Sequence, residues 1–408
     1  MKGLIIITPE EQLHIIESGI DRLVPRDLML EKLKKGTPLN IKLGVDPTAP
    51  DIHLGHAVPL RKLRQFQDLG HHVTLIIGDG TALIGDPSGR NTTRPQLTKE
   101  QIAQNAKTYV DQAFKILDKD KTTLAYNSTW IFDLDMAGLL EVLSNFTVAR
   151  ILERDDFHKR YTSGQPIALH EFLYPTMQAY DSVVINADVE IGGSDQLFNL
   201  LAGRELMEKR GMEPQVALTL PLLEGIDGVQ KMSKSYGNYI GLTDEPYDMF
   251  GKVMKIPDNL IVKYYRLATA VSVAEIDEIE KGLENNTLHP NEVKRALARA
   301  IVETYYSADD AYLAEEDFNL KFRSHGFPAD APVVEYEFVP TEDGLVYVAK
   351  LLADIKAAQS VSDARRLIDA GAVKINGEAL EAKVYNLSPE HLRGAEVQVG
   401  KKKFFRLG

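Results

Sequence analysis

The sequence predicts an α/β protein that begins with a parallel-sheet domain, continues with an all-helical domain and ends with a small α+β domain. Short apolar runs alternate with helical patterns over the first half of the chain, as they do in βαβ units. Periodic helical segments dominate after about residue 242. Beyond Pro328, Pro332 and Pro340, whose spacing suits a linker, a short helix and strands resume.

The first domain is expected to form a doubly wound parallel sheet. Its expected strands occupy residues 40–45, 72–78, 183–185 and 216–222. A helix is expected between the first two strands, over residues 52–69. Another should start at Thr98, because Thr98 and Gln101 are spaced as a capping box and the apolar positions from Ile102 to Ile116 then step by four and three.

The later segments predict helices and one hairpin. Helices are expected over residues 245–253, 273–283, 291–306 and 363–369. Asn376-Gly377 predicts a hairpin turn after a strand at residues 372–375, and residues 403–407 would be the closing strand. The expected domains are residues 1–242 with an inserted segment at about 120–165, then residues 243–326, a linker at 327–341, and residues 342–408.

The composition excludes several classes of protein. The chain of 408 residues contains no cysteine, which rules out disulfides, thiolate zinc sites, iron–sulfur clusters and a cysteine nucleophile. No apolar run approaches the ~20 residues that span a bilayer. The apolar start of the chain runs into Pro9 and is too short for a signal peptide, so a cytoplasmic protein is expected.

The charge is unevenly distributed along the chain. The net charge of −12 argues by itself against a nucleic-acid binder. From Lys350 to Gly408, however, eleven Lys and Arg stand against seven Asp and Glu, so this tail carries +4 and the remainder −16. Such an asymmetry favours a nucleic-acid contact on the tail, although random scatter would give the same counts.

A first constellation of polar residues joins the first expected strand to the helix after it. Gly44-Val45-Asp46-Pro47-Thr48 is followed by His53-Leu54-Gly55-His56. In open α/β sheets this junction binds ligands, and a helix N-terminus favours phosphate. His53 and His56 are three residues apart and share a face, so they could hydrogen-bond a developing phosphate anion. Two solvated histidines or a metal pair are the alternatives, but the metal reading lacks a local third ligand.

A second constellation is Lys231-Met232-Ser233-Lys234-Ser235, with glycines on both sides that suggest a mobile loop. Two lysines with hydroxyl groups between them can grip a leaving polyphosphate in the transition state. Alone, such a loop is more often solvated surface. A P-loop is absent from the sequence, and Gly78-Asp79-Gly80 lacks the third glycine of a dinucleotide-binding fingerprint.

Together the two constellations resemble the paired signature of class I aminoacyl-tRNA synthetases. Residues 44–48, 83–89, 174–181 and 191–196 are similar to bacterial tyrosyl-tRNA synthetases, and residues 362–368 and 371–377 resemble the S4 RNA-binding module. The resemblance implies a Rossmann-like catalytic domain, a helical anticodon-region domain and an S4-like tail. It also implies activation of L-tyrosine with ATP to tyrosyl-adenylate and pyrophosphate, and then transfer to the 3′ end of tRNA(Tyr). Mg²⁺ would arrive with ATP, held mainly by its phosphates, and the chain would form a homodimer.

The resemblance also implies roles for individual residues. The residues implied at the departing pyrophosphate are Thr48, His53, His56, Lys231, Lys234, Ser235, Arg90 and Arg94. Those implied at ATP are Gly44, Asp46, Gly55, Gly193, Asp195 and Lys234. Those implied at tyrosine are Asp86, Tyr174 and Gln178 for the ammonium, Gln196 near the carboxylate and Asp181 for the phenol hydroxyl. Those implied at tRNA are Arg365, Arg366, Lys374, Lys401, Lys402 and Lys403.

Lys42 departs from the pattern. Many bacterial relatives carry a tyrosine at this position, where it also touches the substrate hydroxyl. The lysine could point away to solvent, with the second hydroxyl contact arriving from elsewhere. A tryptophanyl-tRNA synthetase is the near alternative, and the Asp46-Pro47-Thr48 segment and the S4-like tail count against it. A non-catalytic RNA-binding paralogue is opposed by the intact histidines and lysines, and a nicotinamide dehydrogenase by the missing glycine fingerprint.

Overall fold

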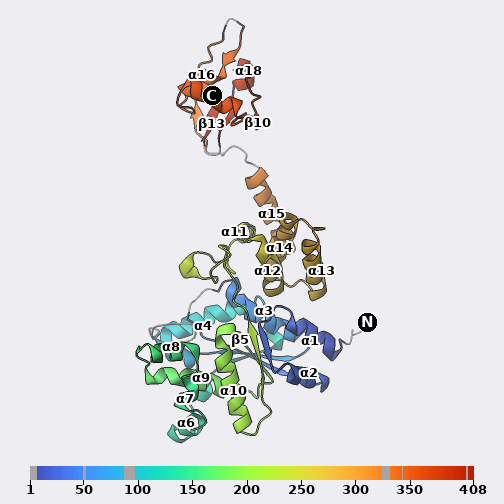
Figure 1. Ribbon diagram of the computed structural model, residues 1–408, viewed down its shortest axis with the longest axis vertical. Helices are drawn as coiled ribbons and strands as arrows, with labels where there is room; N and C mark the ends of the chain where they lie inside the picture. The colour runs from blue at the N-terminus through green and yellow to red at the C-terminus, as the bar shows by residue number, and fades with distance from the viewer. Residues whose placement is uncertain (1–6, 49–51, 87–96, 324–330, 342, 401–402) are drawn as a thin grey trace. The chain divides into compact units, whose positions relative to one another are not determined.

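A computed structural model describes residues 7–48, 52–86, 97–323, 331–341, 343–400 and 403–408 (Figure 1). The chain forms two compact units, one up to Glu315 and one from Glu316. Within the described residues, no helix combines the length and the apolar character needed to cross a membrane.

The first unit is built on a six-stranded sheet with the strand order β1-β6-β5-β2-β3-β4. Its strands are β1 Arg22–Val24, β2 Asn40–Val45, β3 His72–Ile77, β4 Thr122–Tyr126, β5 Val189–Gly193 and β6 Val216–Leu220. All neighbours are parallel except β1, which pairs antiparallel with β6. The predicted doubly wound α/β sheet is confirmed.

The order of the strands determines where the ligand-binding crevice of this sheet is expected. The chain runs from β2 through α3 (Leu54–Asp68) to β3 in one direction, and from β5 through α10 (Leu197–Lys209) to β6 in the other. The order therefore reverses between β2 and β5. Ligands of open α/β sheets bind outside the carboxyl ends of the strands at such a point.

The helices of the first unit cover the sheet and continue beyond it. They are α1 Pro9–Glu17, α2 Arg26–Lys34, α4 Lys99–Ala113, α5 Ser128–Ile131, α6 Met136–Leu143, α7 Val148–Ile151, α8 Asp155–Thr162, α9 Leu173–Val184, α11 Pro246–Val253, α12 Ile261–Ala268, α13 Val273–Glu284, α14 Pro290–Tyr305 and α15 Ala308–Arg323, whose last turns lie past Glu315. The predicted capping box of α4 is present, because Thr98 Oγ1 accepts from Gln101 N and Gln101 Oε1 accepts from Thr98 N. Leu60, Leu63 and Phe66 of α3 are fully buried, and each such side chain contributes roughly 1.5–3 kcal/mol of transfer free energy.

One expected strand is wrong. Residues 183–185 complete α9, in which Ile185 N still donates to Asp181 O, and Asn186 with φ 49° ends the helix. The sheet instead uses β5, four residues later. Packing of α9 against α10 outweighs the preference of three β-branched residues for a strand. The sheet also takes β4 from the start of the 120–165 segment, where no strand was expected.

The second unit contains a five-stranded sheet with the order β10-β9-β12-β13-β7 and a two-stranded pair, β11-β8. Its elements are β7 Val333–Val334, β8 Val346–Tyr347, α16 Val348–Asp354, α17 Val361–Asp369, β9 Val373–Ile375, β10 Glu378–Ala379, β11 Asn386–Leu387, α18 Pro389–Leu392, β12 Glu396–Val399 and β13 Lys403–Leu407. The hairpin at Asn376-Gly377 is confirmed, and both residues have the positive φ, 53° and 85°, that a type I′ turn requires.

Candidate active site

The two sequence motifs meet at the crevice between β2 and β5. His53 forms a β-bridge with Gly241, and Leu54 N donates to Ile240 O over 2.9 Å. These contacts attach the start of α3 to the segment that directly follows the lysine loop. The structure therefore brings together motifs that lie almost 180 residues apart in the sequence.

The crevice contains two adjoining cavities. One of about 300 Å³ is lined, among others, by Gly44, Asp46, Thr48, Gly55, His56, Asp86, Tyr174, Gly193 and Gln196. The other, of about 420 Å³, is lined by residues that include His53, Gly55, His56, Gly193, Lys231, Lys234 and Ser235. A small cavity behind the first reaches Gln178 and Asp181. These cavities share lining residues, so most of the predicted residues lie around adjoining parts of one crevice. Asp195 lines a neighbouring cavity beside Arg154, while Arg90 and Arg94 lie outside the described residues.

The two histidine rings are stacked, with centroids 3.9 Å apart. His56 Nδ1 accepts from His53 N, so its Nε2 carries the proton when the ring is neutral. Burial, the His56 ring and the Lys234 ammonium lower the pKa of His53 to about 3. The pKa of His56 is lowered to about 4, first by desolvation and then by the Lys234 ammonium. Both rings are thus neutral donors near pH 7, and the positive charge of the crevice comes from lysine.

Gly55 is required by the position of the His53 ring. A Cβ at Gly55 would lie 3.0 Å from Cε1 and 3.1 Å from Nδ1 of His53, closer than side chains normally pack. His53 itself is 6% exposed, and its Nδ1 has no hydrogen-bond partner within the described part of the chain. The ring is therefore held in place by packing at the cavity wall.

The lysine loop is held at its base by a buried asparagine. Asn238 Oδ1 accepts from Ser233 N over 2.8 Å, and Asn238 Nδ2 donates to Asp227 Oδ2 and to Lys231 O. Gly237 has φ 65°, the left-handed conformation that favours glycine. Lys231, Lys234 and Ser235 are exposed and line the larger cavity. The sequence does not single out Asn238, since an asparagine beside a glycine suggests only a turn.

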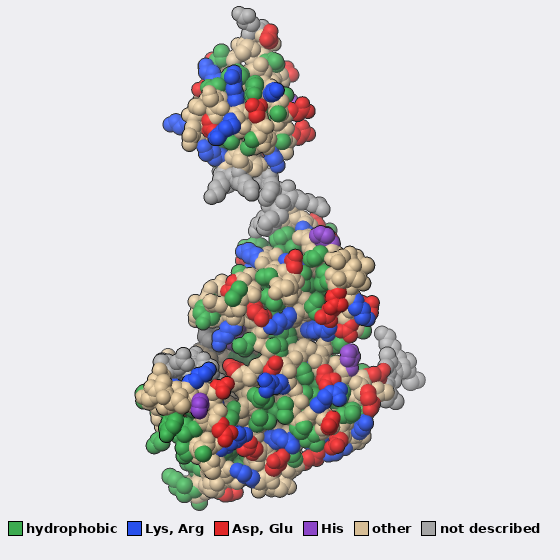
Figure 2. Space-filling view, in the orientation of Figure 1, with side chains coloured by type: hydrophobic (Ala, Val, Ile, Leu, Met, Phe, Trp, Pro, Cys, Tyr) green, Lys and Arg blue, Asp and Glu red, His purple; other side chains and the backbone are tan. Residues whose placement is uncertain are grey.

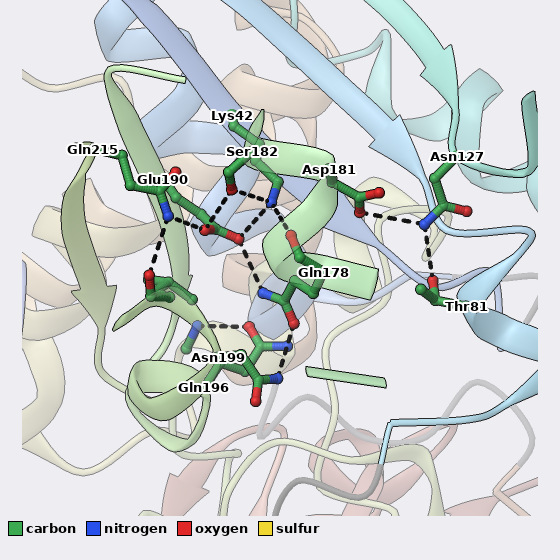
Figure 3. Close-up of polar contacts among 12 residues, drawn as sticks. Lys42, Thr81, Asn127, Gln178, Asp181, Ser182, Glu190, Gln196, Asn199 and Gln215 are labelled. Atoms are coloured by element: carbon green, nitrogen blue, oxygen red, sulfur yellow. Dashed lines mark hydrogen bonds and ion pairs between the residues drawn. The ribbon is translucent and has the colours of Figure 1, made fainter. Parts of the chain in front are cut away.

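The deepest polar group of the crevice is Asp181. Its Oδ1 accepts from Trp130 Nε1 over 2.8 Å and its Oδ2 from Asn127 Nδ2 over 3.3 Å. Burial raises the pKa of Asp181 to about 6, against the opposing effect of the Lys42 ammonium and of these donors. Asn127 also donates to Thr81 Oγ1, and Figure 3 shows it between Thr81 and Asp181. Nothing in the sequence pattern indicated Asn127, whereas Trp130, as the only tryptophan of the chain, could have been noticed.

A second group of polar residues lies toward the mouth of the same cavity. Tyr174 Oη donates to Asp46 Oδ2 over 3.0 Å. Asp86 accepts from Gln196 Nε2 and from Arg154 Nη2, each over 3.3 Å. Four residues predicted from separate motifs thus lie within two hydrogen-bonded groups, and Arg154 is an addition that the sequence did not reveal.

No group of three or more His, Asp or Glu side chains able to hold a metal ion occurs within the residues that the structure describes.

The family model described as tRNA synthetases class I (W and Y) matches residues 34–323, and the S4 domain model matches residues 348–391. The chain belongs to the class I tRNA synthetases (W and Y).

Full-length relatives are similar to this synthetase over almost all of its length. It is 50% identical to the tyrosine–tRNA ligase of Thermotoga maritima over 98% of both chains, and 50% identical to that of Aquifex aeolicus over 98% of this chain and 99% of the other. Among solved structures, the C-terminally truncated mitochondrial tyrosyl-tRNA synthetase of Aspergillus nidulans has a TM-score of 0.63 at 25% identity, covering 77% of this chain and 94% of that one. The Archaeoglobus fulgidus tyrosyl-tRNA synthetase complexed with L-tyrosine shares the fold, with a TM-score of 0.62 at 24% identity, covering 75% of this chain and 99% of that one.

Lys42 of the synthetase does not point to solvent, so that expectation is wrong. The side chain is fully buried, and its Nζ donates to Gln178 O, Ser182 Oγ and Glu190 Oε1 over 2.7–2.8 Å. An unpaired ammonium would not be stable in this interior, and the carboxylate of Glu190, itself 1% exposed, supplies its partner.

The tail residues of the synthetase differ in how they are held. The Arg365 guanidinium lies over the rings of Tyr347 and Tyr385, and its Nε donates to Tyr347 Oη. Arg366 is 80% exposed and paired with Asp363. The remaining basic residues predicted there are Lys374 on β9, Lys403, whose Nζ donates to Ala357 O, and Lys401 and Lys402, which lie outside the described residues.

Proposed function

We propose that this synthetase activates L-tyrosine with ATP, forming tyrosyl-adenylate and pyrophosphate, and then transfers tyrosine to the 3′ end of tRNA(Tyr). The observation that carries the proposal is the buried carboxylate of Asp181, held by two donors at the closed end of a crevice whose mouth is bordered by the histidine and lysine motifs. Relatives at half identity over the whole chain carry the same activity in their names. The chain is a tyrosine–tRNA ligase.

Tyrosine would lie with its phenol at Asp181 and its ammonium toward Asp86, Tyr174 and Gln178. Gln196 would stand near the carboxylate that attacks the α-phosphorus of ATP. The hydrogen bonds among these residues support this placement, since they hold the acceptors in position before substrate arrives. No covalent enzyme intermediate is needed, because the tyrosine carboxylate is itself the nucleophile.

The leaving pyrophosphate would lie between the two motifs. Thr48 and the neutral rings of His53 and His56 would contact the departing phosphates from one wall of the crevice, while Lys231, Lys234 and Ser235 would approach from the other. Arg90 and Arg94 are proposed to contact the departing pyrophosphate as well. Gly44, Asp46, Gly55, Gly193 and Asp195 would line the nucleotide. Mg²⁺ would come with ATP and be held mainly by its phosphates.

ATP–pyrophosphate exchange measured with each of the twenty amino acids tests the function. Exchange that depends on tyrosine is the expected result. Exchange that depends on tryptophan would show that the protein has the tryptophan specificity that its family model also covers. Exchange with none of the twenty amino acids would reject amino-acid activation altogether.

The pH dependence of tyrosine activation should follow Asp181. Because its pKa is raised to about 6, the carboxyl is ionised above that pH and becomes protonated as the pH falls through it. The protonated form is a weaker acceptor for the phenol, so kcat/KM for tyrosine should fall on the acid side with an apparent pKa near 6, the value for free enzyme. His53 and His56 titrate lower and should not contribute. Exchange rates between about pH 5 and pH 8 measure this limb, and an activity that is flat across about pH 6 contradicts the role of Asp181.

The tail is proposed to bind tRNA through Arg365, Arg366, Lys374 and the lysines 401–403. The S4 match and the exposed guanidinium of Arg366 support this. The proposed domains are residues 1–242, 243–326 and 342–408 with a linker at 327–341.

Deleting residues 342–408 should leave tyrosine-dependent exchange within about twofold of wild type but lower tRNA charging at least about tenfold, because phosphate contacts supply much of the affinity for nucleic acid.

Charging assays at two salt concentrations complete that experiment. Loss of the tail should also reduce the salt dependence of charging, since fewer phosphates are neutralised. A truncated chain that charges tRNA as well as the full one would show that the tail is not the tRNA contact.

A homodimer is proposed from the surface of the 120–165 segment and its neighbours. Apolar side chains are exposed there, and Figure 2 shows several of them at the lower left, around α6. They include Met136, Leu140, Val148, Tyr161 and Leu169. Contiguous apolar surface of this kind is typical of protein interfaces. The proposed compartment is the cytoplasm, where tRNA is charged.

A further inference from the structure

We propose that Lys42 and Glu190 act together as positioning residues for tyrosine: they fix the turn of α9 that carries Asp181 and set the orientation of the Gln178 amide. The inference rests on the proposed placement of tyrosine in this crevice. Figure 3 shows Lys42, Ser182, Gln178 and Glu190 directed toward one another. Lys42 and Glu190 would not contact the substrate themselves. They would act through Asp181 and Gln178.

Lys42 holds α9 on both sides of Asp181. Its ammonium has three N–H donors, and they go to Gln178 O, Ser182 Oγ and Glu190 Oε1 over 2.8, 2.7 and 2.8 Å. Residues 178 and 182 lie one helical turn apart, and Asp181 lies between them. A side chain from β2 thereby attaches this turn of α9 to the sheet and sets how far Asp181 projects into the pocket.

Glu190 sets the orientation of the Gln178 amide. A carboxylate only accepts hydrogen bonds, so the amide nitrogen must face it, and Gln178 Nε2 donates to Glu190 Oε1 over 3.0 Å. Gln178 Oε1 is then directed to the other side, where Asn199 Nδ2 donates to it over 2.8 Å. That oxygen is the atom able to accept from a substrate ammonium. A glutamine at position 190 would tolerate either orientation of the Gln178 amide and remove this selection.

The second carboxylate oxygen of Glu190 is also held by hydrogen bonds. Glu190 Oε2 accepts from Ser182 Oγ over 3.1 Å and from Gln215 Nε2, which also donates to Leu200 O. The charge of Lys42 favours the ionised form of Asp181 and that of Glu190 opposes it, so the one ammonium serves two buried carboxylates. This arrangement explains why a lysine can occupy position 42: it supports Asp181 indirectly instead of contacting the phenol.

Kinetics of three variants test the proposal: Glu190→Gln, Lys42→Met and the double variant that carries both changes. Lys62→Met is the matched control, because Lys62 is also a buried lysine of the first unit, but its Nζ donates to Ile16 O and Ser18 O, away from the crevice. Tyrosine-dependent ATP–pyrophosphate exchange is measured per active site, with KM for tyrosine and for ATP determined separately, together with the melting temperature and the affinity for tyrosine at equilibrium.

We expect Glu190→Gln and the double variant to raise KM and Kd for tyrosine about tenfold or more while KM for ATP stays within about twofold. Lys42→Met alone leaves two buried carboxylates, Glu190 and Asp181, without a nearby ammonium, whereas the double variant leaves only Asp181, so the double variant should melt closer to wild type than Lys42→Met does. Lys62→Met should lower the melting temperature and leave both KM values within about twofold.

A folded double variant that binds tyrosine as wild type does would overturn the positioning role, whatever the single variants do. A double variant that fails to fold while Lys62→Met folds would assign the pair to stability and count equally against the proposal. Failure of the proposed function is a separate result, because it would appear in the wild type as an absence of tyrosine-dependent exchange.

Discussion

Replacing Asp181 by alanine is expected to abolish the preference of the enzyme for tyrosine over phenylalanine. In the native pocket phenylalanine would leave the buried carboxylate with the Trp130 and Asn127 donors but without the phenol donor, and a hydrogen bond to a charged group is worth about 1.5–3 kcal/mol, or a factor of roughly 10 to 150. In Asp181→Ala the carboxylate that accepts from the phenol is absent, so tyrosine gains no hydrogen bond that phenylalanine lacks. Its kcat/KM for tyrosine should therefore fall by at least about that factor, and the rates for the two amino acids should become similar. Exchange assays with tyrosine and phenylalanine measure both effects.

Asp188→Ala is a suitable control for this variant. Asp188 precedes β5 at the N-terminal end of the strand, opposite the crevice, where it accepts from Lys32 Nζ and from Asn40 N. Its removal should lower stability but keep the selectivity for tyrosine. If Asp181→Ala retains the wild-type ratio of tyrosine to phenylalanine, the hydroxyl is recognised elsewhere in the pocket.

The main parts of the fold were predictable because they depend on local patterns. The apolar runs of β2, β3 and β6 and the capping box of α4 determine their own conformation, and the glycine and histidine motif follows from its place after β2. The run at residues 183–185 was misassigned because its conformation depends on packing against α10, which no local pattern reports. β5 was missed for a related reason, since two of its five residues are glycines that weaken a strand signal.

The candidate site was predictable in its motifs but not in its supporting contacts. The sequence does not reveal that Lys42 is buried, because the carboxylate that pairs with it, Glu190, is 148 residues away. Asn127 and Trp130 reach Asp181 across more than 50 residues. A single sequence names residue types that suit a reaction, whereas the partners that orient those residues depend on which strands become neighbours.

Replacing His53 by alanine is expected to slow formation of the adenylate about a hundredfold to a thousandfold, the usual effect of removing one preorganised donor from developing negative charge. His53 lines the cavity of the lysine loop and not the one assigned to tyrosine, so the affinity for tyrosine should stay within about twofold. Single-turnover measurement of adenylate formation, alongside equilibrium binding of tyrosine, separates the two quantities.

His72→Ala supplies the control, because His72 is exposed at the start of β3, the end of the strand away from the crevice. It should change neither rate nor affinity. Since the ring of His53 is neutral at the pH of the assay, its loss should lower the rate by a constant factor and leave the acid limb near pH 6 in place, whereas substitution of Asp181 should remove that limb. A normal rate of adenylate formation in His53→Ala would reject the histidine as a donor to pyrophosphate, and a shifted acid limb would mean that His53 titrates in the reaction.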